Sequence, residues 1–206
     1  MLSDKGFDLW ADGYDKSVGL ADETDSYPFA GYRRLLNIIY NDILSRPGRD
    51  VLDIGFGTGT LAAKLYEKGC RIFGQDFSGR MLELAAAKMP DARLYQGDFS
   101  QALVEPLRTR KYDAIVATYS LHHLSDEGKV EFISTLLPLL KEGGRIYIGD
   151  VAFATRTELE ACRAACGDDW DTDEIYFVFE ELKTVFENLT FEKVSSCAGI
   201  LTLSQG

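Results

Sequence analysis

The stretch from Asp50 to Thr60, "DVLDIGFGTGT", decides how the fold is interpreted. It places Gly55, Gly57 and Gly59 directly after an apolar run that is typical of a buried strand. Glycine costs backbone entropy, so such a cluster indicates either a sharp turn or a close approach of another group to the backbone. A helical pattern follows, which is the context of a nucleotide-binding loop. A bare tight turn is the alternative.

The composition limits the class of protein and its partners. A chain of 206 residues with 46% hydrophobic and 27% charged residues is typical of one ordinary globular domain. The formal net charge of −11, without any lysine- or arginine-rich block, argues against nucleic acid as a partner. The first residues do not resemble a signal peptide, and no apolar run is long enough to cross a membrane. We therefore expect a cytoplasmic protein, monomeric or homodimeric, that does not bind membranes.

The cysteines give no reason to expect a metal. The four of them, Cys70, Cys162, Cys166 and Cys197, lack the paired spacing of a zinc site. Small buried residues are the simplest interpretation. The sequence therefore predicts no metal site.

Short strand patterns alternate with amphipathic helical patterns from Asp50 onward, which predicts parallel strands joined by right-handed crossovers. Helices are expected from Thr60, from Ser78 and from Ser125, the last ending at "EGG", 142–144. The expected strands span 51–54, 71–76, 92–96, 112–120 and 145–150.

The C-terminal part departs from this alternation. A helix is expected at about 176–188, followed by the β-like runs 190–196 and 200–206. The three residues between these runs allow only an antiparallel hairpin. The sequence thus predicts an open, mostly parallel α/β sheet that ends in an antiparallel hairpin.

We expect one domain over 1–206. It divides into an N-terminal helical cap (1–48), a cofactor-binding core (49–150), an acidic lid insert (151–175) and a helix with the terminal hairpin (176–206). Cap and insert are expected to cover the carboxyl ends of the strands, where open α/β sheets bind ligands.

The kind of nucleotide follows from what surrounds the glycines. A dinucleotide loop needs glycine where Thr60 stands, and no G-K-[ST] follows for a phosphate loop. Asp53, just before the glycines, favours a positively charged ligand over a pyrophosphate. Asp76, nineteen residues after Gly57, suits a ribose diol, and Asp98 follows the third strand. Each carboxylate alone could be a solvated residue or a helix cap; at successive strand tips they predict a nucleoside site.

These motifs together resemble the class I S-adenosylmethionine-dependent methyltransferases. The similar stretches are "VLDIGFGTG", "FGQDFS", "QGDF", "YDAIVATYSLHHL" and "LLKEGGRIYIGD", and the resemblance covers about residues 10–205. The opening "LWADGYDKSV" is similar to small-molecule bacterial methyltransferases of the methionine-recycling type. The resemblance implies a Rossmann-like, doubly wound sheet of seven mostly parallel strands with an antiparallel C-terminal hairpin.

The resemblance also implies S-adenosylmethionine as the cofactor and assigns residues to its parts. Asp53 and the glycines would border the methionine part, Asp76 would bind the ribose hydroxyls, and Asp98 would meet the adenine amine. Phe77, Met81 and Phe99 would flank the adenine ring. The full set of expected cofactor-binding residues is Asp53, Gly55, Gly57, Gly59, Asp76, Phe77, Met81, Asp98, Phe99 and Tyr119.

Methyl transfer from a sulfonium mainly requires alignment and exclusion of water, and needs a base only if the acceptor must lose a proton. The candidates for that base are His122, His123 and Tyr14. Adjacent histidines point to different sides, so at most one should face the pocket. The aromatic residues Trp10, Tyr14, Tyr119 and Trp170 are expected to wall the acceptor pocket or cover the sulfonium; core packing is the alternative for both tryptophans.

The predicted function is an S-adenosylmethionine-dependent methyltransferase that acts on a small molecule. Two alternatives stay open. A non-catalytic S-adenosylmethionine-binding protein could keep every motif above. A nicotinamide-dependent oxidoreductase would need the third glycine at position 60 and a catalytic pair such as Tyr-Lys, and neither is evident.

Overall fold

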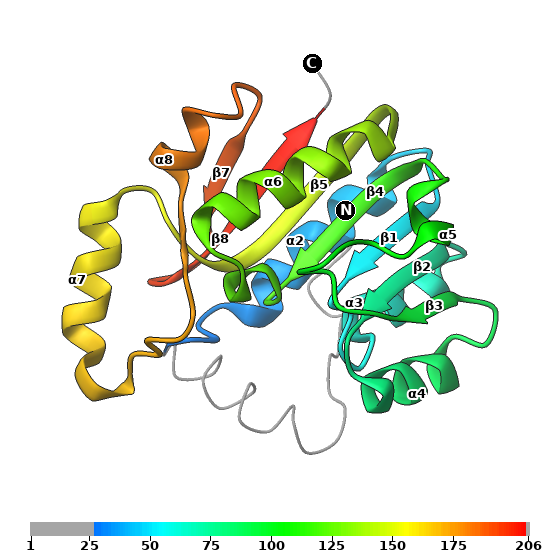
Figure 1. The fold of residues 1–206 in the computed structure, drawn as a ribbon, viewed down its shortest axis with the longest axis horizontal. Coiled ribbons are helices and arrows are strands. Elements are labelled where there is room, and N and C mark those ends of the chain that lie inside the picture. Colours follow the sequence, from blue (N-terminus) through cyan, green and yellow to red (C-terminus); the bar gives the residue numbers. More distant parts are fainter. Residues whose placement is uncertain (1–26, 205–206) are drawn as a thin grey trace.

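A twisted sheet forms the centre of the molecule, and helices cover both of its faces (Figure 1). The computed structural model describes residues 27–204. The strands are β1 (Asp50–Ile54), β2 (Arg71–Asp76), β3 (Arg93–Gln96), β4 (Tyr112–Thr118), β5 (Leu140–Phe153), β6 (Phe177–Val178), β7 (Thr190–Lys193) and β8 (Ala198–Ser204). The helices are α2 (Tyr32–Ser45), α3 (Thr60–Glu67), α4 (Gly79–Lys88), α5 (Glu105–Arg108), α6 (Asp126–Leu136), α7 (Arg156–Cys166) and α8 (Phe179–Lys183).

The strand order is β3-β2-β1-β4-β5-β8-β7, and β6 pairs with the end of β5. The strands from β3 to β5 are parallel to one another. β8 runs antiparallel to both of its neighbours, β5 and β7. The predicted doubly wound sheet of seven mostly parallel strands with an antiparallel C-terminal hairpin is thus confirmed, and the two-residue strand β6 is an addition to it.

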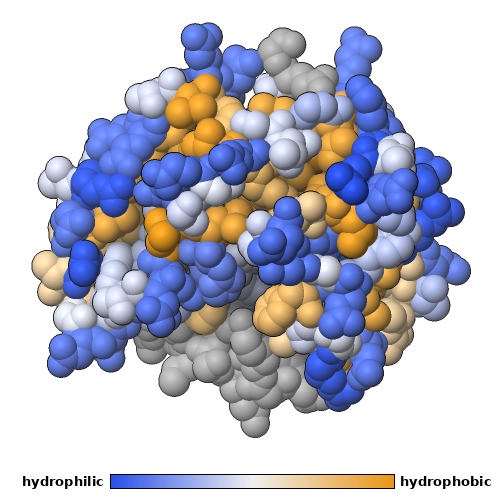
Figure 2. Space-filling view, in the orientation of Figure 1, coloured by the Kyte–Doolittle hydropathy of each residue, from blue (hydrophilic) through white to orange (hydrophobic). Residues whose placement is uncertain are grey.

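Alternate residues of the central strands face the two helical layers. In β1, Leu52 and Ile54 belong to the apolar cluster beneath α6 and α8, whereas Val51 belongs to the cluster beneath α2, α3 and α4. Because β1 is buried along its whole length, its apolar residues Val51, Leu52 and Ile54 do not alternate with exposed ones. The outer side of α6 carries exposed acidic residues such as Glu127 and Glu131, and hydrophilic side chains cover this helix in Figure 2.

Two helix boundaries were predicted wrongly. α6 ends at Leu136 and a short 3-10 turn, Leu137–Leu139, follows, so "EGG" lies inside β5 and does not end the helix. Pro138 in that turn has no N–H to continue the helical hydrogen bonds. The helix expected at 176–188 is reduced to α8, because Phe177 and Val178 instead pair with Ala152 and Phe153 of β5.

Helix α2, the described helix of the predicted N-terminal cap, packs on a face of the sheet. The buried residues of α2, among them Leu35 and Ile39, make this contact. Gly149 of β5 makes this contact possible, since a Cβ atom there would lie 2.4 Å from Leu35 Cδ2. Among the described residues of this segment, Phe29, Tyr32 and Leu36 reach the carboxyl ends of the strands.

Within residues 27–204, no helix combines the length and the apolar character that crossing a membrane requires.

Candidate active site

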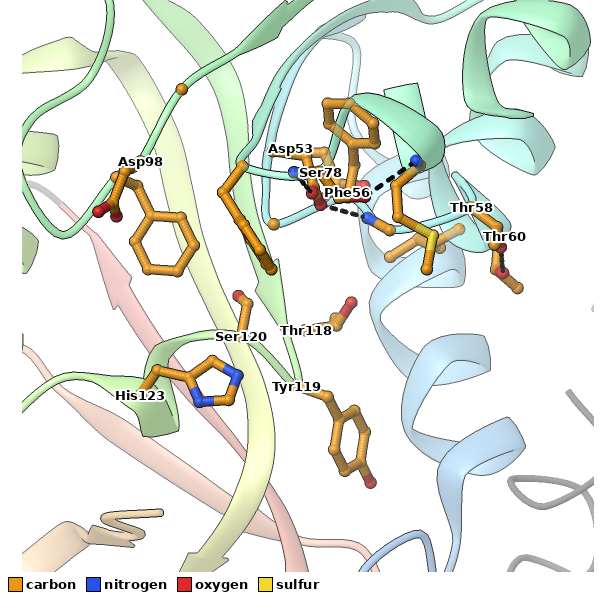
Figure 3. Close-up of a pocket in the computed structure, with 18 of the residues that line it drawn as sticks. Asp53, Phe56, Thr58, Thr60, Ser78, Asp98, Thr118, Tyr119, Ser120 and His123 are labelled. Atoms are coloured by element: carbon orange, nitrogen blue, oxygen red, sulfur yellow. Dashed lines mark hydrogen bonds between the residues drawn. The ribbon is translucent and has the colours of Figure 1, made fainter. Parts of the chain in front are cut away.

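A cavity of about 860 Å³ opens where the strand order reverses, at the carboxyl ends of β1 and β4. Open α/β sheets bind ligands at this point because the loops after neighbouring strands diverge there. Residues from the loops after β1, β2, β3 and β4 line the cavity, together with the start of α2. In Figure 3, Asp98 lies across the cavity from Thr58 and Thr60, and His123, Ser120 and Tyr119 lie along a third side.

The glycines after β1 have separate roles. All three have positive φ, which other residues adopt only with strain. Gly57 lines the cavity, and nothing lies within 4 Å of the place where its Cβ would be. Gly59 is not among the lining residues; a Cβ there would lie 2.9 Å from Met89 Cε and 3.2 Å from Ala85 Cβ. The structure therefore assigns Gly59 to the packing of α3 against α4, not to the cavity.

Asp76 connects two loops at the tip of β2. Its Oδ2 accepts the backbone N–H of Gly57 at 2.9 Å, and its Oδ1 accepts that of Ser78 at 2.9 Å. The side chain that caps α4 is Ser78, which accepts the N–H of Met81. Asp76 thus does not replace the helix cap, and its carboxylate oxygens keep further lone pairs for a ligand.

Asp53 is a buried carboxyl at the edge of the cavity. It is 3% exposed, and its Oδ1 has no hydrogen-bond partner among the described residues. Burial, and to a smaller extent the charge of Asp76, raises the pKa of Asp53 to about 7. A positively charged ligand beside this group would favour its ionised form.

The expected adenine side contains residues of different exposure. Asp98 is exposed, and its Oδ1 accepts the N–H of Ser100 at 2.9 Å, an interaction with Ser100 that lowers the pKa of Asp98. Phe99 is buried against Phe132, whereas Phe77 is 70% exposed. Met81 also lines the cavity. All four of these predicted residues thus line the cavity.

The end of β4 supplies the side of the cavity nearest to α2. Tyr119 has a φ of 49° and donates its N–H to Gly149 O at 2.8 Å. Its ring packs against Phe29 and Tyr32, with centroids 5.2 and 5.3 Å apart. Sequence reasoning missed these two aromatic residues, although "FAGY", 29–32, stands directly at the start of the amphipathic helix.

The two histidines lie in different surroundings. His123 lines the cavity (Figure 3). His122 does not; it is buried, with Nδ1 2.7 Å from Asp150 Oδ1 and Nε2 3.3 Å from Glu174 Oε1. Burial is the largest single influence and lowers the pKa of His122, but the carboxylates of Asp150 and Glu174 together outweigh it, and the pKa is raised overall.

Trp170 packs away from the cavity lining, stacked on Tyr27 at 5.1 Å and edge-on to Tyr176 at 4.9 Å. Of the residues expected on the acceptor side, Trp10 and Tyr14 lie outside the described residues.

The charge of the lining distinguishes between ligand classes. Asp53, Asp76 and Asp98 border the cavity, and no lysine or arginine is found among the described residues that line it. A pyrophosphate would meet three carboxyl groups and no cationic side chain, whereas a cationic nucleoside would be attracted. The lining thus favours a cationic nucleoside.

Comparisons with known proteins agree with this geometry. The model of a family described as "Methyltransferase domain" matches residues 51–144. An uncharacterized methyltransferase of Geobacillus thermodenitrificans is 38% identical over 193 residues, which are 90% of this chain and 86% of the relative. One from Anoxybacillus flavithermus is 39% identical over 155 residues, 75% and 70% of the two chains.

Two solved structures share the fold. Magnesium protoporphyrin IX methyltransferase from Synechocystis PCC 6803, with bound SAH, has a TM-score of 0.68 at 19% identity, covering 94% of this chain and 90% of the other. An S-adenosylmethionine-dependent methyltransferase from Clostridium acetobutylicum has a TM-score of 0.67 at 18% identity, covering 94% and 99%. The chain therefore belongs to the methyltransferase-domain family, within the class I S-adenosylmethionine-dependent methyltransferase superfamily.

Proposed function

We propose that this methyltransferase binds S-adenosylmethionine in the cavity between β1 and β4 and transfers its methyl group to a small molecule. The observation that carries the proposal is the buried Asp53 carboxyl, with an unpartnered oxygen, in a cavity whose described lining has three aspartates but no lysine or arginine. S-adenosylmethionine carries positive charge at its sulfonium and its amine, so it fits this lining.

The predicted cofactor-binding residues are assigned to parts of the cofactor. Asp76 binds the ribose hydroxyls, and Asp98 accepts a hydrogen bond from the adenine amine. Phe77, Met81 and Phe99 flank the adenine ring. The methionine part lies against Asp53, Gly55 and Gly57, and Gly59 acts only through helix packing.

When bound, the cofactor supplies an activated methyl group on a positively charged sulfur. The chain's own residues align the acceptor with it and exclude water. Phe29, Tyr32 and Tyr119 form an aromatic wall suited to both tasks. Of the two histidines, His123 is the candidate that takes a proton from an acceptor that must lose one.

A small-molecule acceptor agrees with the charge of the protein. The net charge of −11 opposes approach to nucleic acid, whose phosphates repel an acidic surface. A cavity of about 860 Å³ has room for a cofactor and a metabolite-sized acceptor.

The test has two stages. The protein is purified under native conditions, and mass spectrometry identifies any nucleoside that stays bound. Small hydroxyl, amine and thiol compounds are then screened for S-adenosylhomocysteine release. Release that depends on one acceptor supports the proposal. Tight binding of S-adenosylmethionine without turnover on any acceptor would favour the non-catalytic binding protein.

A further inference from the structure

Three potential metal ligands meet beside the cavity. His122 and His123 lie on the 3-10 turn Leu121–His123 after β4, and Glu174 lies in the segment between α7 and β6. Each offers one ligand atom, and these atoms all lie within 4.8 Å of one another. Because His123 also lines the cavity, the group stands at the edge of the proposed acceptor site.

The ring of His122 is held by a fully buried carboxylate. Its Nδ1 lies 2.7 Å from Asp150 Oδ1, which also accepts the N–H of Val151 at 2.8 Å. With a proton on Nδ1, the ring presents Nε2 toward Glu174, 3.3 Å away. A carboxylate that accepts from one histidine nitrogen while the other faces outward is the usual support of a metal-binding histidine.

The Glu174 carboxylate is held in place by its neighbours. The backbone N–H of Ile175 donates to His122 O at 2.8 Å, and Ile175 O accepts from the buried Lys129 Nζ at 2.6 Å. The Tyr176 hydroxyl donates to Glu174 Oε2 at 2.8 Å, which leaves Oε1 beside the histidine. The segment after α7 is therefore fastened to the turn that carries both imidazoles.

We propose that His122, His123 and Glu174 bind a divalent transition-metal cation of the Zn²⁺ type. Two imidazoles and one carboxylate are ligands that Zn²⁺ and Co²⁺ accept, and three protein ligands leave a coordination position open. This site goes beyond the proposed function, since the cation binds without the adenosyl cofactor. While the cation is bound, the ligating nitrogen of His123 is not available as a base.

Cobalt titration of the full-length protein tests the site. The protein is first freed of metals with a chelator, and Co²⁺ binding is then followed by its visible absorption, with Zn²⁺ added as a competitor. We expect one equivalent of Co²⁺ to bind and to be displaced by Zn²⁺. Glu174→Gln and His123→Ala should each weaken Co²⁺ binding at least about tenfold, since each removes a ligand.

Asp173→Asn is the matched control, because it removes the same charge from an exposed neighbour that lies outside the cluster. It should bind Co²⁺ like the wild type. Absence of Co²⁺ binding by the wild type, or equal binding by Glu174→Gln, would overturn the site. Titration of Glu174→Gln with S-adenosylhomocysteine tests the proposed function separately: unchanged affinity for that ligand, with Co²⁺ binding lost, supports both assignments.

Discussion

The Asp76 carboxylate accepts the backbone N–H of Gly57 at 2.9 Å and thereby ties the tip of β2 to the glycine loop after β1. The same side chain is the one we assign to the ribose. The order of the loop and the binding of the cofactor therefore depend on one residue, and its substitution should affect both.

Asp76→Ala should weaken S-adenosylhomocysteine binding by roughly ten- to a few hundredfold, because hydrogen bonds to a charged group contribute about 1.5–3 kcal/mol each. The loss is smaller than the full sum because water replaces the carboxylate as a partner of the ribose hydroxyls. The variant should also lose about 1–3 kcal/mol of stability, since the N–H groups of Gly57 and Ser78 lose their acceptor. Calorimetric titration and thermal unfolding of one sample measure the two effects.

Asp76→Asn is the matched control. It keeps one acceptor oxygen, so both of its losses should be smaller than those of Asp76→Ala. Affinity within twofold of the wild type in Asp76→Ala, with a lower melting temperature, would mean that Asp76 is structural only.

Asp53 should make both stability and binding depend on pH. Its folded pKa of about 7 lies above the value of 3.8 for an exposed aspartate, so the fold favours the protonated form. The stability that this group contributes to the ligand-free protein is fully present below about pH 4 and is lost as the pH rises through 7. Urea unfolding at several pH values should show that the free energy of unfolding falls over this pH range, and Asp53→Asn should remove that dependence.

Binding of S-adenosylmethionine should shift the ionisation of Asp53. A cation beside the carboxyl favours the charged form, so binding near pH 6.5 should release part of a proton. Titrations in two buffers of different ionisation enthalpy measure that release. An equal release by Asp53→Asn would mean that the proton comes from another group.

The grouping of the three aspartates at the carboxyl ends of the strands could be predicted, because it follows from the alternation of strands and helices. Parallel strands bring their carboxyl ends to one edge, so Asp53, Asp76 and Asp98 had to lie near one another once the order of elements was recognised. The lining of the cavity includes all three. The role of Gly59 could not be predicted, since its neighbour Met89 is set by how α3 packs on α4.

Contacts between distant segments account for the other differences. Phe177 and Val178 continue a helical pattern locally, but pairing with the end of β5 overrides it. Glu174 meets the two histidines only through the path of the segment after α7, so no spacing in the sequence could indicate a cluster. Tertiary contacts, and not local preference, decide each of these cases.

Gly57→Ala and Gly59→Ala should separate binding from packing. Both residues have positive φ, so both substitutions should cost about 1–2 kcal/mol of stability. Gly57→Ala adds a methyl group at the cavity and should lower the affinity for S-adenosylhomocysteine about tenfold. Gly59→Ala should keep that affinity, because its new methyl group meets Met89 and Ala85. Equal losses of affinity would contradict the separation.

In the metal-free protein, His123→Ala should lower turnover on the acceptor found by screening while the affinity for S-adenosylhomocysteine and the melting temperature stay unchanged, because its ring is exposed at the cavity. His122→Ala should instead lower the melting temperature, since it leaves the buried Asp150 without its side-chain partner at a cost of about 1–3 kcal/mol. Full turnover by His123→Ala would remove this residue from the mechanism.

The most direct test of the central claim is calorimetric titration of the full-length protein with S-adenosylhomocysteine and, separately, with NADH. The acidic lining predicts saturable binding of S-adenosylhomocysteine in the micromolar range and no comparable affinity for NADH, whose pyrophosphate would meet three carboxyl groups and no lysine or arginine. Saturable NADH binding without any response to S-adenosylhomocysteine would contradict the account.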